Sequence, residues 1–382
     1  MKILIVSRVY THPVVKGNSR AILAQAEALK QLGNDVHFLY VDEPHPKTTR
    51  KQYERGLVET KQYWGDKFHY MRKSLVEKLW NVFVKRFIRG GVYWKPNDYY
   101  PWHLSKYVRQ LNRQNHFDAC IVNYFELSKL LIDIDIPKKA LHTHDSFTFR
   151  DIITNSTNVR ALMPNDEATV MQRAQHIFAL QNDEAVFFHR LSPYSNIYTI
   201  YTTIDFHNQP IVGNHNIVFL SANEKFNHNG LSWFLEKIFP KIQTVFHDAR
   251  LFIGGGICKA LQNQKMPEGV ELCGFVDDVA KFYMQGDIAI NPVYQGTGLK
   301  IKTIESLSYN KVTIVHPHSK EGLYQKESLP LFVSKETKDW VDFLCKVWND
   351  KDLIKEIKMR NKAYIDSMNS FILSEYKRFM DA

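Results

Sequence analysis

Residues 288–305 read IAINPVYQGTGLKIKTIE, and this order of residue types predicts more about the fold than any other part of the chain. A short apolar run of strand type is followed by glycines, then by lysines, and then by one carboxylate. Glycines let backbone N–H groups approach an anion, a following helix adds its dipole, and lysines add full positive charge. We therefore expect a parallel α/β fold in which this turn binds a diphosphate. The residues expected to do so are Gly296, Gly298, Lys300 and Lys302. Just past the turn, the carboxylate of Glu305 can accept hydrogen bonds from two vicinal hydroxyl groups.

On both sides of this turn, apolar runs of strand length alternate with segments of helical periodicity, a pattern typical of parallel sheets covered by helices. In the second half the expected strands are Asn216–Leu220, Ala249–Ile253, Val270–Leu272, Ile288–Asn291, Val312–Val315 and Leu331–Val333. In the first half they are Lys2–Ser7, Asp35–Val41, Asp118–Val122, Lys139–Thr143, His176–Leu180 and Ile197–Tyr201. Helices are expected at Ser19–Leu32, Gly230–Val245 and Asp278–Gln285. The predicted fold class is α/β, with two Rossmann-like, doubly wound domains facing across a cleft.

The chain has 382 residues, enough for roughly two domains of ordinary size. A polar break at 205–214 separates the two strand series and predicts a linker. We expect an N-terminal domain at 1–205, with an insertion at about 45–115, and a C-terminal domain at 206–366. The aromatic-rich segment 367–382 is expected to be a helix that packs back on the N-terminal domain.

Composition excludes several classes of protein. The four cysteines are scattered, without metal spacing or a disulfide pattern, and predict reduced side chains. The N-terminal apolar run is too short for a signal peptide, and no apolar stretch approaches the roughly 18–20 residues that cross a bilayer. No recognisable nucleic-acid-binding module is present. We expect a cytoplasmic protein, at most peripheral at the inner face of the cell membrane, with no nucleic-acid partner.

The net charge of +10 is concentrated in one segment. Residues 61–113 contain twelve lysines and arginines against three acidic residues, interleaved with tyrosines, tryptophans and phenylalanines. This mixture suits contact with an anionic membrane surface or an acidic glycan. The alternative is an irregular insertion whose aromatic side chains pack on the domain and whose lysines are solvated. Both interpretations stay open.

Residues 216–323 resemble the donor-binding half of a GT-B glycosyltransferase of family 4, also called group 1. The similar elements, in order, are Phe219-Leu220-Ser221, Asn227 with Trp233-Phe234 and Pro240, Phe252-Ile253-Gly254-Gly255-Gly256, Val270 to Asp278, the turn from Gly296 to Glu305, and Glu321-Gly322-Leu323. The first half is similar more weakly. There Gly17-Asn18 follows the first strand, and His142-Thr143-His144-Asp145 resembles a segment that carries a histidine near the reaction centre.

The resemblance implies a retaining glycosyltransferase that needs no metal or other cofactor. Its donor would be a nucleotide sugar, and its acceptor a polysaccharide, a lipopolysaccharide or a lipid-linked glycan. The residues it implies for catalysis are Lys225, Lys300, His144 and Asp145. The residues it implies for donor binding are Gly17, Asn18, Ser221, Asn227, Gln295, Gly296, Thr297, Gly298, Leu299, Lys302 and Glu305. Two positions depart from the family pattern: Gln295 replaces an acidic residue, and Lys225 alone represents a basic pair.

Several alternatives remain at this stage. Glu305 and Asn227 could cap helices instead of binding a donor. His142, His144 and Asp145 could bind zinc, or form a general-base pair, instead of positioning a sugar. His316-Pro317-His318 faces the site or forms a solvated loop. For the whole chain, the alternatives are a non-catalytic homologue that binds or assists a partner, or an epimerase or phosphorylase of the same architecture.

Overall fold

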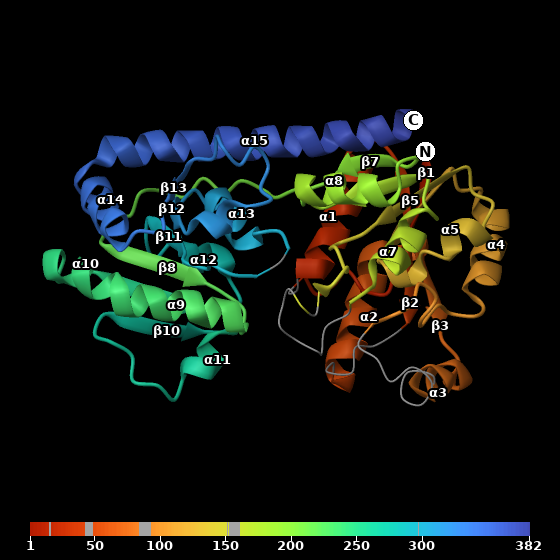
Figure 1. Ribbon diagram of the computed structural model, residues 1–382, viewed down its shortest axis with the longest axis horizontal. Helices are drawn as coiled ribbons and strands as arrows, with labels where there is room; N and C mark the ends of the chain where they lie inside the picture. Colours follow the sequence, from red (N-terminus) through yellow and green to blue (C-terminus); the bar gives the residue numbers. More distant parts are fainter. Residues whose placement is uncertain (15–16, 43–48, 84–92, 151, 153–160, 297) are drawn as a thin grey trace. The chain divides into compact units, whose positions relative to one another are not determined.

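The computed structural model describes residues 1–14, 17–42, 49–83, 93–150, 152, 161–296 and 298–382, which form two compact units (Figure 1). Unit 1 consists of Met1–Thr203 with Phe371–Ala382, and unit 2 consists of Ile204–Ser370. The chain changes unit at 203/204 and at 370/371, where the sequence analysis placed boundaries after 205 and 366. Each unit contains one parallel sheet with alternating helices, which confirms the predicted α/β class.

The sheet of unit 1 has the strand order β3-β2-β1-β4-β5-β6-β7, and every neighbouring pair is parallel. Its strands are β1 (Lys2–Ser7), β2 (Asp35–Asp42), β3 (Phe68–Arg72), β4 (Ala119–Asn123), β5 (Lys138–His142), β6 (His176–Ala179) and β7 (Asn196–Thr199). Its helices are α1 (Gly17–Gln31), α2 (Arg50–Trp64), α3 (Leu75–Phe83), α4 (Leu104–Asn115), α5 (Leu130–Asp133), α7 (Pro164–Met171) and α8 (Asn182–Leu191). The central strands β1 and β4 are buried almost throughout, as expected for parallel strands covered on both faces.

Over its described residues, the region at about 45–115 contains regular elements, so the expectation of an irregular segment is wrong. The expectation that its aromatic side chains pack on the domain is confirmed for Trp64 and Tyr70. The region contains α2, α3, α4 and the edge strand β3, which pairs with β2. Trp64 is 4% exposed and stacks on Phe38 with ring centroids 5.1 Å apart. The hydroxyl of Tyr70 donates to Asp42 at 3.0 Å. Part of this basic, aromatic segment therefore packs on unit 1, whereas Trp80, Phe83 and Trp102 are exposed.

The last helix, α15 (Lys351–Asp381), begins in unit 2 and ends in unit 1. Its final turns contribute aromatic rings to unit 1, where Phe379 lies 5.0 Å from Phe178 between ring centroids. Arg378 donates to the carbonyl of Ile197 at 2.9 Å. The segment assigned to unit 1 starts at Phe371, a few residues after the predicted start at 367. Over the described part of the chain, α15 and the other helices lack the combination of length and apolar character that spanning a bilayer requires.

The sheet of unit 2 has the order β10-β9-β8-β11-β12-β13, again with every pair parallel. Its strands are β8 (Asn216–Leu220), β9 (Arg250–Gly254), β10 (Val270–Gly274), β11 (Ile288–Asn291), β12 (Val312–Val315) and β13 (Leu331–Val333). Its helices are α9 (Lys225–Lys237), α10 (Phe239–Val245), α11 (Cys258–Leu261), α12 (Val279–Tyr283), α13 (Ile301–Ser308) and α14 (Thr337–Asn349). The single helix expected at Gly230–Val245 is two helices, because Pro240 stands at the start of the second.

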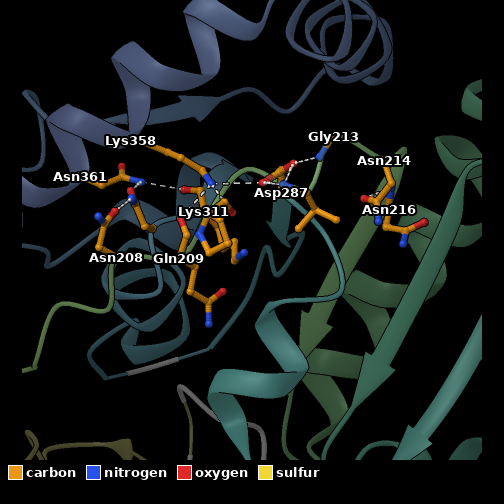
Figure 2. A network of polar contacts seen from close by, with 12 residues as sticks. Asn208, Gln209, Gly213, Asn214, Asn216, Asp287, Lys311, Lys358 and Asn361 are labelled. Carbon is orange, nitrogen blue, oxygen red and sulfur yellow. Dashed lines mark hydrogen bonds and ion pairs between the residues drawn. The ribbon is translucent and has the colours of Figure 1, made fainter.

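The polar break at 205–214 belongs to unit 2, and it is held there by a buried polar network (Figure 2). Asp287, directly before β11, accepts hydrogen bonds from the N–H groups of Val212 at 2.9 Å and Gly213 at 2.7 Å. Lys358 of α15 pairs with Asp287 at 3.1 Å and donates to the carbonyl of Pro210 at 3.1 Å. The expected linker is therefore attached to the amino-terminal edge of the unit 2 sheet.

Candidate functional site

In unit 2 the strand order reverses between β8 and β11, because β9 and β10 lie on one side and β12 and β13 on the other. In open parallel sheets, ligands bind beyond the carboxyl ends of the strands at this switch point. Ser221 directly follows β8, and the turn predicted to bind a diphosphate directly follows β11. The predicted residues of this half therefore lie where the topology favours a ligand.

Lys302 joins the two sides of this switch point. It lies in the first turn of α13, and its Nζ donates to Ser221 Oγ at 3.3 Å and to Oδ1 of Asn227. The ammonium lies 5.6 Å from the centre of the Phe219 ring. Burial, with a smaller effect of the charge on Lys300, lowers the pKa of Lys302 to about 8. At pH 7 Lys302 is a partly desolvated cation, and such a charge stabilises a nearby anion more than an exposed lysine does.

Lys300 is the N-cap residue of α13, and its Nζ donates to the carbonyl of Gly298 at 2.9 Å. Gly296 and Gly298 have positive φ values of 120° and 75°, a conformation that glycine adopts readily. A Cβ added at Gly298 would meet no atom within 4 Å, so the backbone there is open to a ligand. Thr297, between them, lies outside the described residues, and Leu299 is half-buried.

A buried chain of hydrogen bonds connects both ends of this turn. The amide Nδ2 of Asn291 donates to Thr303 Oγ1 at 2.9 Å, and that hydroxyl donates to the carbonyl of Ser319 at 3.0 Å. The Ser319 hydroxyl in turn donates to the carbonyl of Val293 at 2.7 Å. All three polar side chains are at most 2% exposed. The chain fixes the start of α13, and with it both lysines, relative to β11.

Glu305 lies in the second turn of α13 and is 8% exposed. Because α13 starts at Ile301, Glu305 is beyond the positions where a carboxylate caps a helix. Asn227 is not a cap either. The N-cap residue of α9 is Glu224, and the amide of Asn227 donates to the carbonyl of Ala222 at 2.9 Å. The capping alternatives for Glu305 and Asn227 are therefore wrong.

The remaining predicted residues of unit 2 lie on its surface. Lys225, the first residue of α9, and Gln295 are both exposed. His318, which follows β12, is half-buried. Burial and the charge of Lys300 lower the pKa of His318, although a hydrogen bond with the backbone of Gly296 opposes this shift. His318 therefore lies beside the glycine turn as a neutral ring and is not part of a solvated loop.

Unit 1 has its own switch point, between β1 and β4. Asn123, the last residue of β4, donates through Nδ2 to Gln25 Oε1 at 3.3 Å. Its Oδ1 lies 2.7 Å from Nε2 of His144, and Nε2 of Gln25 lies 2.8 Å from Nδ1 of His142. The rings of His142 and His144 stack with centroids 4.1 Å apart. The two histidines thus belong to one polar cluster at the carboxyl edge of the sheet.

This cluster keeps both histidines neutral. Burial lowers the pKa of His142 to about 3, and burial together with His142 lowers the pKa of His144 far below its ordinary value. Since Asn123 Nδ2 donates to Gln25, its Oδ1 accepts a hydrogen bond from the Nε2–H group of His144. Tyr124 stacks on His144 at 4.3 Å, and both residues have positive φ values of 73° and 64°. Such backbone conformations are uncommon outside glycine and concentrate at functional sites.

Asp145 directs its charge toward Arg150, whose guanidinium lies 2.8 Å from Oδ2. Among the described side chains, no group of three or more His, Cys, Asp and Glu residues is arranged to hold a metal ion, so the zinc alternative for His142, His144 and Asp145 lacks support.

Gly17 and Asn18 are the first two residues of α1, the helix that follows β1. The side chain of Asn18 accepts a hydrogen bond from the N–H of Ser19 at 2.9 Å.

Several residues of these sites escaped the sequence analysis. They are Gln25, Asn123, Tyr124, Glu184, Asn291, Thr303 and Ser319. A polar residue at the end of an apolar strand, as in ACIVN and IAIN, is the signal that could have identified Asn123 and Asn291. No comparable signal marks Glu184. Burial and the charge of Asp145 raise the pKa of Glu184 to about 8, so its carboxyl group is protonated at neutral pH.

Comparison with known proteins agrees with this geometry. Residues 214–350 match the family model described as "Glycosyl transferases group 1". This match covers β8 to α14, and therefore the whole switch point of unit 2. The comparison with curated proteins yields no match.

Solved structures share the fold over the entire chain. TarM of S. aureus has a TM-score of 0.66 at 10% identity, with 100% of this chain and 99% of TarM covered. Anabaena HepE in complex with UDP and glucose has a TM-score of 0.62 at 10% identity, with both chains fully covered. The pneumococcal O-GlcNAc transferase GtfA, in complex with UDP and GlcNAc, has a TM-score of 0.64 at 9% identity, with 100% and 98% covered. The chain thus shares the GT-B fold with these proteins, and its residues 214–350 are similar to the group 1 glycosyl transferases.

Proposed function

We propose that the protein is a retaining, metal-independent glycosyltransferase. It moves a sugar from a nucleotide-sugar donor to a cell-surface polysaccharide, lipopolysaccharide or lipid-linked glycan. The observation that carries this proposal is the position of Lys302 across the switch point, in contact with Ser221 and Asn227. A half-buried cation at this place, beside a glycine turn and a helix start, suits the diphosphate of a nucleotide sugar.

Transfer from such a donor requires the diphosphate to leave while positive charge grows on the anomeric carbon. The protein therefore has to stabilise an anion and exclude water. Lys300 and Lys302 supply the charge, and backbone groups of the glycine turn supply hydrogen bonds. The carboxylate of Glu305 can accept two hydrogen bonds from vicinal ribose hydroxyls. The leaving phosphate takes the proton of the acceptor hydroxyl.

His144 and Asp145 position a sugar in this proposal. The lowered pKa of His144 makes the ring neutral, so it is suited to hydrogen bonding and not to electrostatic stabilisation of a phosphate. Gly17 and Asn18, at the start of α1, are assigned to donor binding in this proposal. Lys225, exposed at the first residue of α9, is available to a phosphate oxygen without disturbing the core.

Support for the donor class comes from the proteins that share the fold. HepE is described in complex with UDP-glucose. TarM is described in complex with UDP and alpha-GlcNAc-glycerol. A uridine diphosphate sugar is therefore the first donor to test. The basic segment 61–113 supports a peripheral location at the inner face of the cell membrane, and hence a lipid-linked acceptor.

The experiment is a thermal-shift comparison of UDP, GDP and ADP. A ligand present at 100 times its Kd and bound only to the folded chain stabilises it by about 2.7 kcal/mol, which a melting curve resolves. We expect one diphosphate to raise the melting temperature in the wild type and in Lys346→Ala, an exposed lysine of α14. The shift should be much smaller in Lys300→Ala and in Glu305→Ala. If no nucleoside diphosphate raises the melting temperature, the proposal fails.

Turnover separates this function from its alternatives. A non-catalytic homologue, which Gln295 in place of an acidic residue favours, would bind a nucleoside diphosphate without consuming any donor. An epimerase would interconvert nucleotide sugars in the absence of an acceptor. A transferase hydrolyses the donor slowly without an acceptor, and we expect Lys300→Ala to reduce this rate by about two orders of magnitude.

A further inference from the structure

Four described apolar side chains of helix α3 lie on its outside. Val76, Leu79, Trp80 and Phe83 are 64%, 72%, 50% and 48% exposed. Their spacing places them on one face of the helix. On an ordinary surface helix this face packs on the core and the polar face meets water. In α3 the arrangement is reversed, which leaves a continuous apolar face in contact with solvent.

The other face of α3 is anchored by polar contacts. The side chain of Glu77 is 1% exposed, and its carboxylate accepts the N–H of Ser74 at 2.8 Å and the N–H of Trp102 at 2.5 Å. Ser74 Oγ accepts the N–H of Glu77 at 3.2 Å, which completes a reciprocal cap at the helix start. These contacts fix the rotation of the helix, so the exposure of its apolar face is built in. Trp102, 53% exposed, adds a further aromatic ring beside the helix.

Helix α3 leaves the sheet at the edge that bears the histidine cluster. All strands of unit 1 are parallel, and α3 follows the carboxyl end of the edge strand β3, where it lies at the periphery of the unit (Figure 1). His142 and His144 follow β5 at the same edge. In the order β3-β2-β1-β4-β5, these strands are separated by four strand spacings, or roughly 20 Å. A surface bound by α3 would therefore lie near the predicted sugar-positioning groups.

The charge of the segment identifies the surface. Residues 61–113 hold nine more positive than negative charges. Arg72, which is exposed, precedes α3, and in the sequence Lys85, Arg86 and Arg89 follow it. Lys73 is not part of this flank, because it is buried and donates to the carbonyl of Tyr99 at 2.6 Å. An apolar helix face with tryptophan and phenylalanine, flanked by lysines and arginines, is the composition of helices that lie in the interface of an anionic bilayer. A second copy of this chain would bring like charges together.

We propose that α3, together with Trp102, seats the protein on an anionic membrane surface by inserting Val76, Leu79, Trp80 and Phe83 among the lipid headgroups. Membrane binding by α3 would hold the carboxyl edge of the unit 1 sheet close to the bilayer. The use of this closeness in catalysis rests on the proposed function, because it assumes a lipid-linked acceptor at this edge. The binding of lipid by α3 does not.

The test is co-sedimentation of the full chain with vesicles of phosphatidylcholine that contain about 30% of the anionic lipid phosphatidylglycerol. We expect the wild type to bind. Leu79→Ser combined with Trp80→Ser should bind at least tenfold more weakly, because it removes apolar contact without touching the anchors of α3. The control is Tyr194→Ser with Phe275→Ser, which removes two strongly exposed rings (101% and 69%) elsewhere and should leave binding unchanged.

Two results would overturn the proposal. One is equal vesicle binding by the wild type and the α3 double variant. The other is concentration-dependent self-association of the wild type without vesicles that the α3 variant abolishes, because the face would then belong to an interface between copies. The UDP-induced thermal shift, measured on the same samples, reports the donor site separately. If the α3 double variant loses vesicle binding but keeps the UDP-induced thermal shift, the membrane-binding role of α3 is supported. If no diphosphate shifts the melting temperature of the wild type, only the proposed function is contradicted.

Discussion

The two edges of the unit 2 sheet each bury a lysine, and they use it in opposite ways. At the carboxyl edge, Lys302 Nζ donates to Ser221 and Asn227 from a half-buried position beside an open glycine turn. At the amino-terminal edge, Lys311 precedes β12 and is 0% exposed. None of the described groups pairs with its Nζ through a hydrogen bond. Burial, with the charge of Lys358, lowers the pKa of Lys311 to about 7.

This difference separates a lysine proposed to bind an anion from a structural one. Lys302 keeps most of its charge at pH 7, and it follows a turn in which a Cβ added at Gly298 would meet no atom within 4 Å. Lys311 lies inside the network that attaches residues 208–213 to the sheet, together with Asp287, Lys358 and Asn361 (Figure 2). A lowered pKa alone would assign both lysines to function. The open turn beside Lys302 and the closed packing around Lys311 distinguish them.

The largest expected effect concerns the amino-terminal edge of the unit 2 sheet, where the polar network is packed. Asp287→Asn leaves Lys358 as a buried charge without its counter-ion, and breaking such a pair costs about 3–5 kcal/mol of unfolding free energy. Hydrogen exchange of the β11 and β12 amides measures this loss directly. Asp277→Asn, at an exposed position, is the control. A loss below about 1 kcal/mol would show that the network contributes little, which is the range of exposed ion pairs.

At the carboxyl edge of the unit 2 sheet, loss of a lysine should lower activity and leave stability nearly unchanged. Lys302→Met retains the stem of the side chain but removes a preorganised charge, so sugar transfer should fall by about two to three orders of magnitude. The melting temperature without ligand should change little or rise, since burial of the ammonium is unfavourable. Lys346→Met serves as the control. Transfer within a factor of about three of wild type would return Lys302 to a structural role.

Much of the fold could be predicted from sequence, and the reason is local. The strands Asn216–Leu220 and Ile288–Asn291 have the predicted bounds. Each is an apolar run of residues with high β-strand propensity, and each run ends at a polar residue or a turn. Strand β3, with the sequence FHYMR, was missed because it has no such run. Its strand character depends on pairing with β2, a tertiary effect that overrides weak propensity.

The candidate site was predictable in its types of residue but not in its contacts. The glycines, lysines and Glu305 follow from their order after a strand. The contact of Lys302 with Ser221, 81 residues away, depends on the exact start of α13 and on which strands are neighbours. Neither can be derived from spacing alone, and the same holds for the hydrogen bonds of Asn123 and His144 in unit 1.

A smaller effect should appear in the pH dependence of stability. Lys311 has a folded-state pKa of about 7 against 10.5 in the unfolded chain. Between these values the unfolded chain binds the proton and the folded chain does not, so stability rises with pH and is lost as pH falls toward 7. We expect the wild type to gain about 2 kcal/mol relative to Lys311→Met between pH 7 and pH 9. The measurement is the unfolding free energy from urea unfolding at each pH. If this free energy changes equally with pH in both proteins, Lys311 is not a buried lysine with a lowered pKa.

The smallest expected effect tests whether the glycine turn needs its support. Thr303→Val removes the hydroxyl that accepts from Asn291 and donates to the carbonyl of Ser319, with little change in volume. Because it leaves buried groups unpaired and loosens the start of α13, donor affinity and transfer should fall by about tenfold. Thr303→Ser keeps the hydroxyl and should restore both. Equal losses in the two variants would mean that packing of the methyl group, and not the hydrogen-bond chain, holds Lys302 in place.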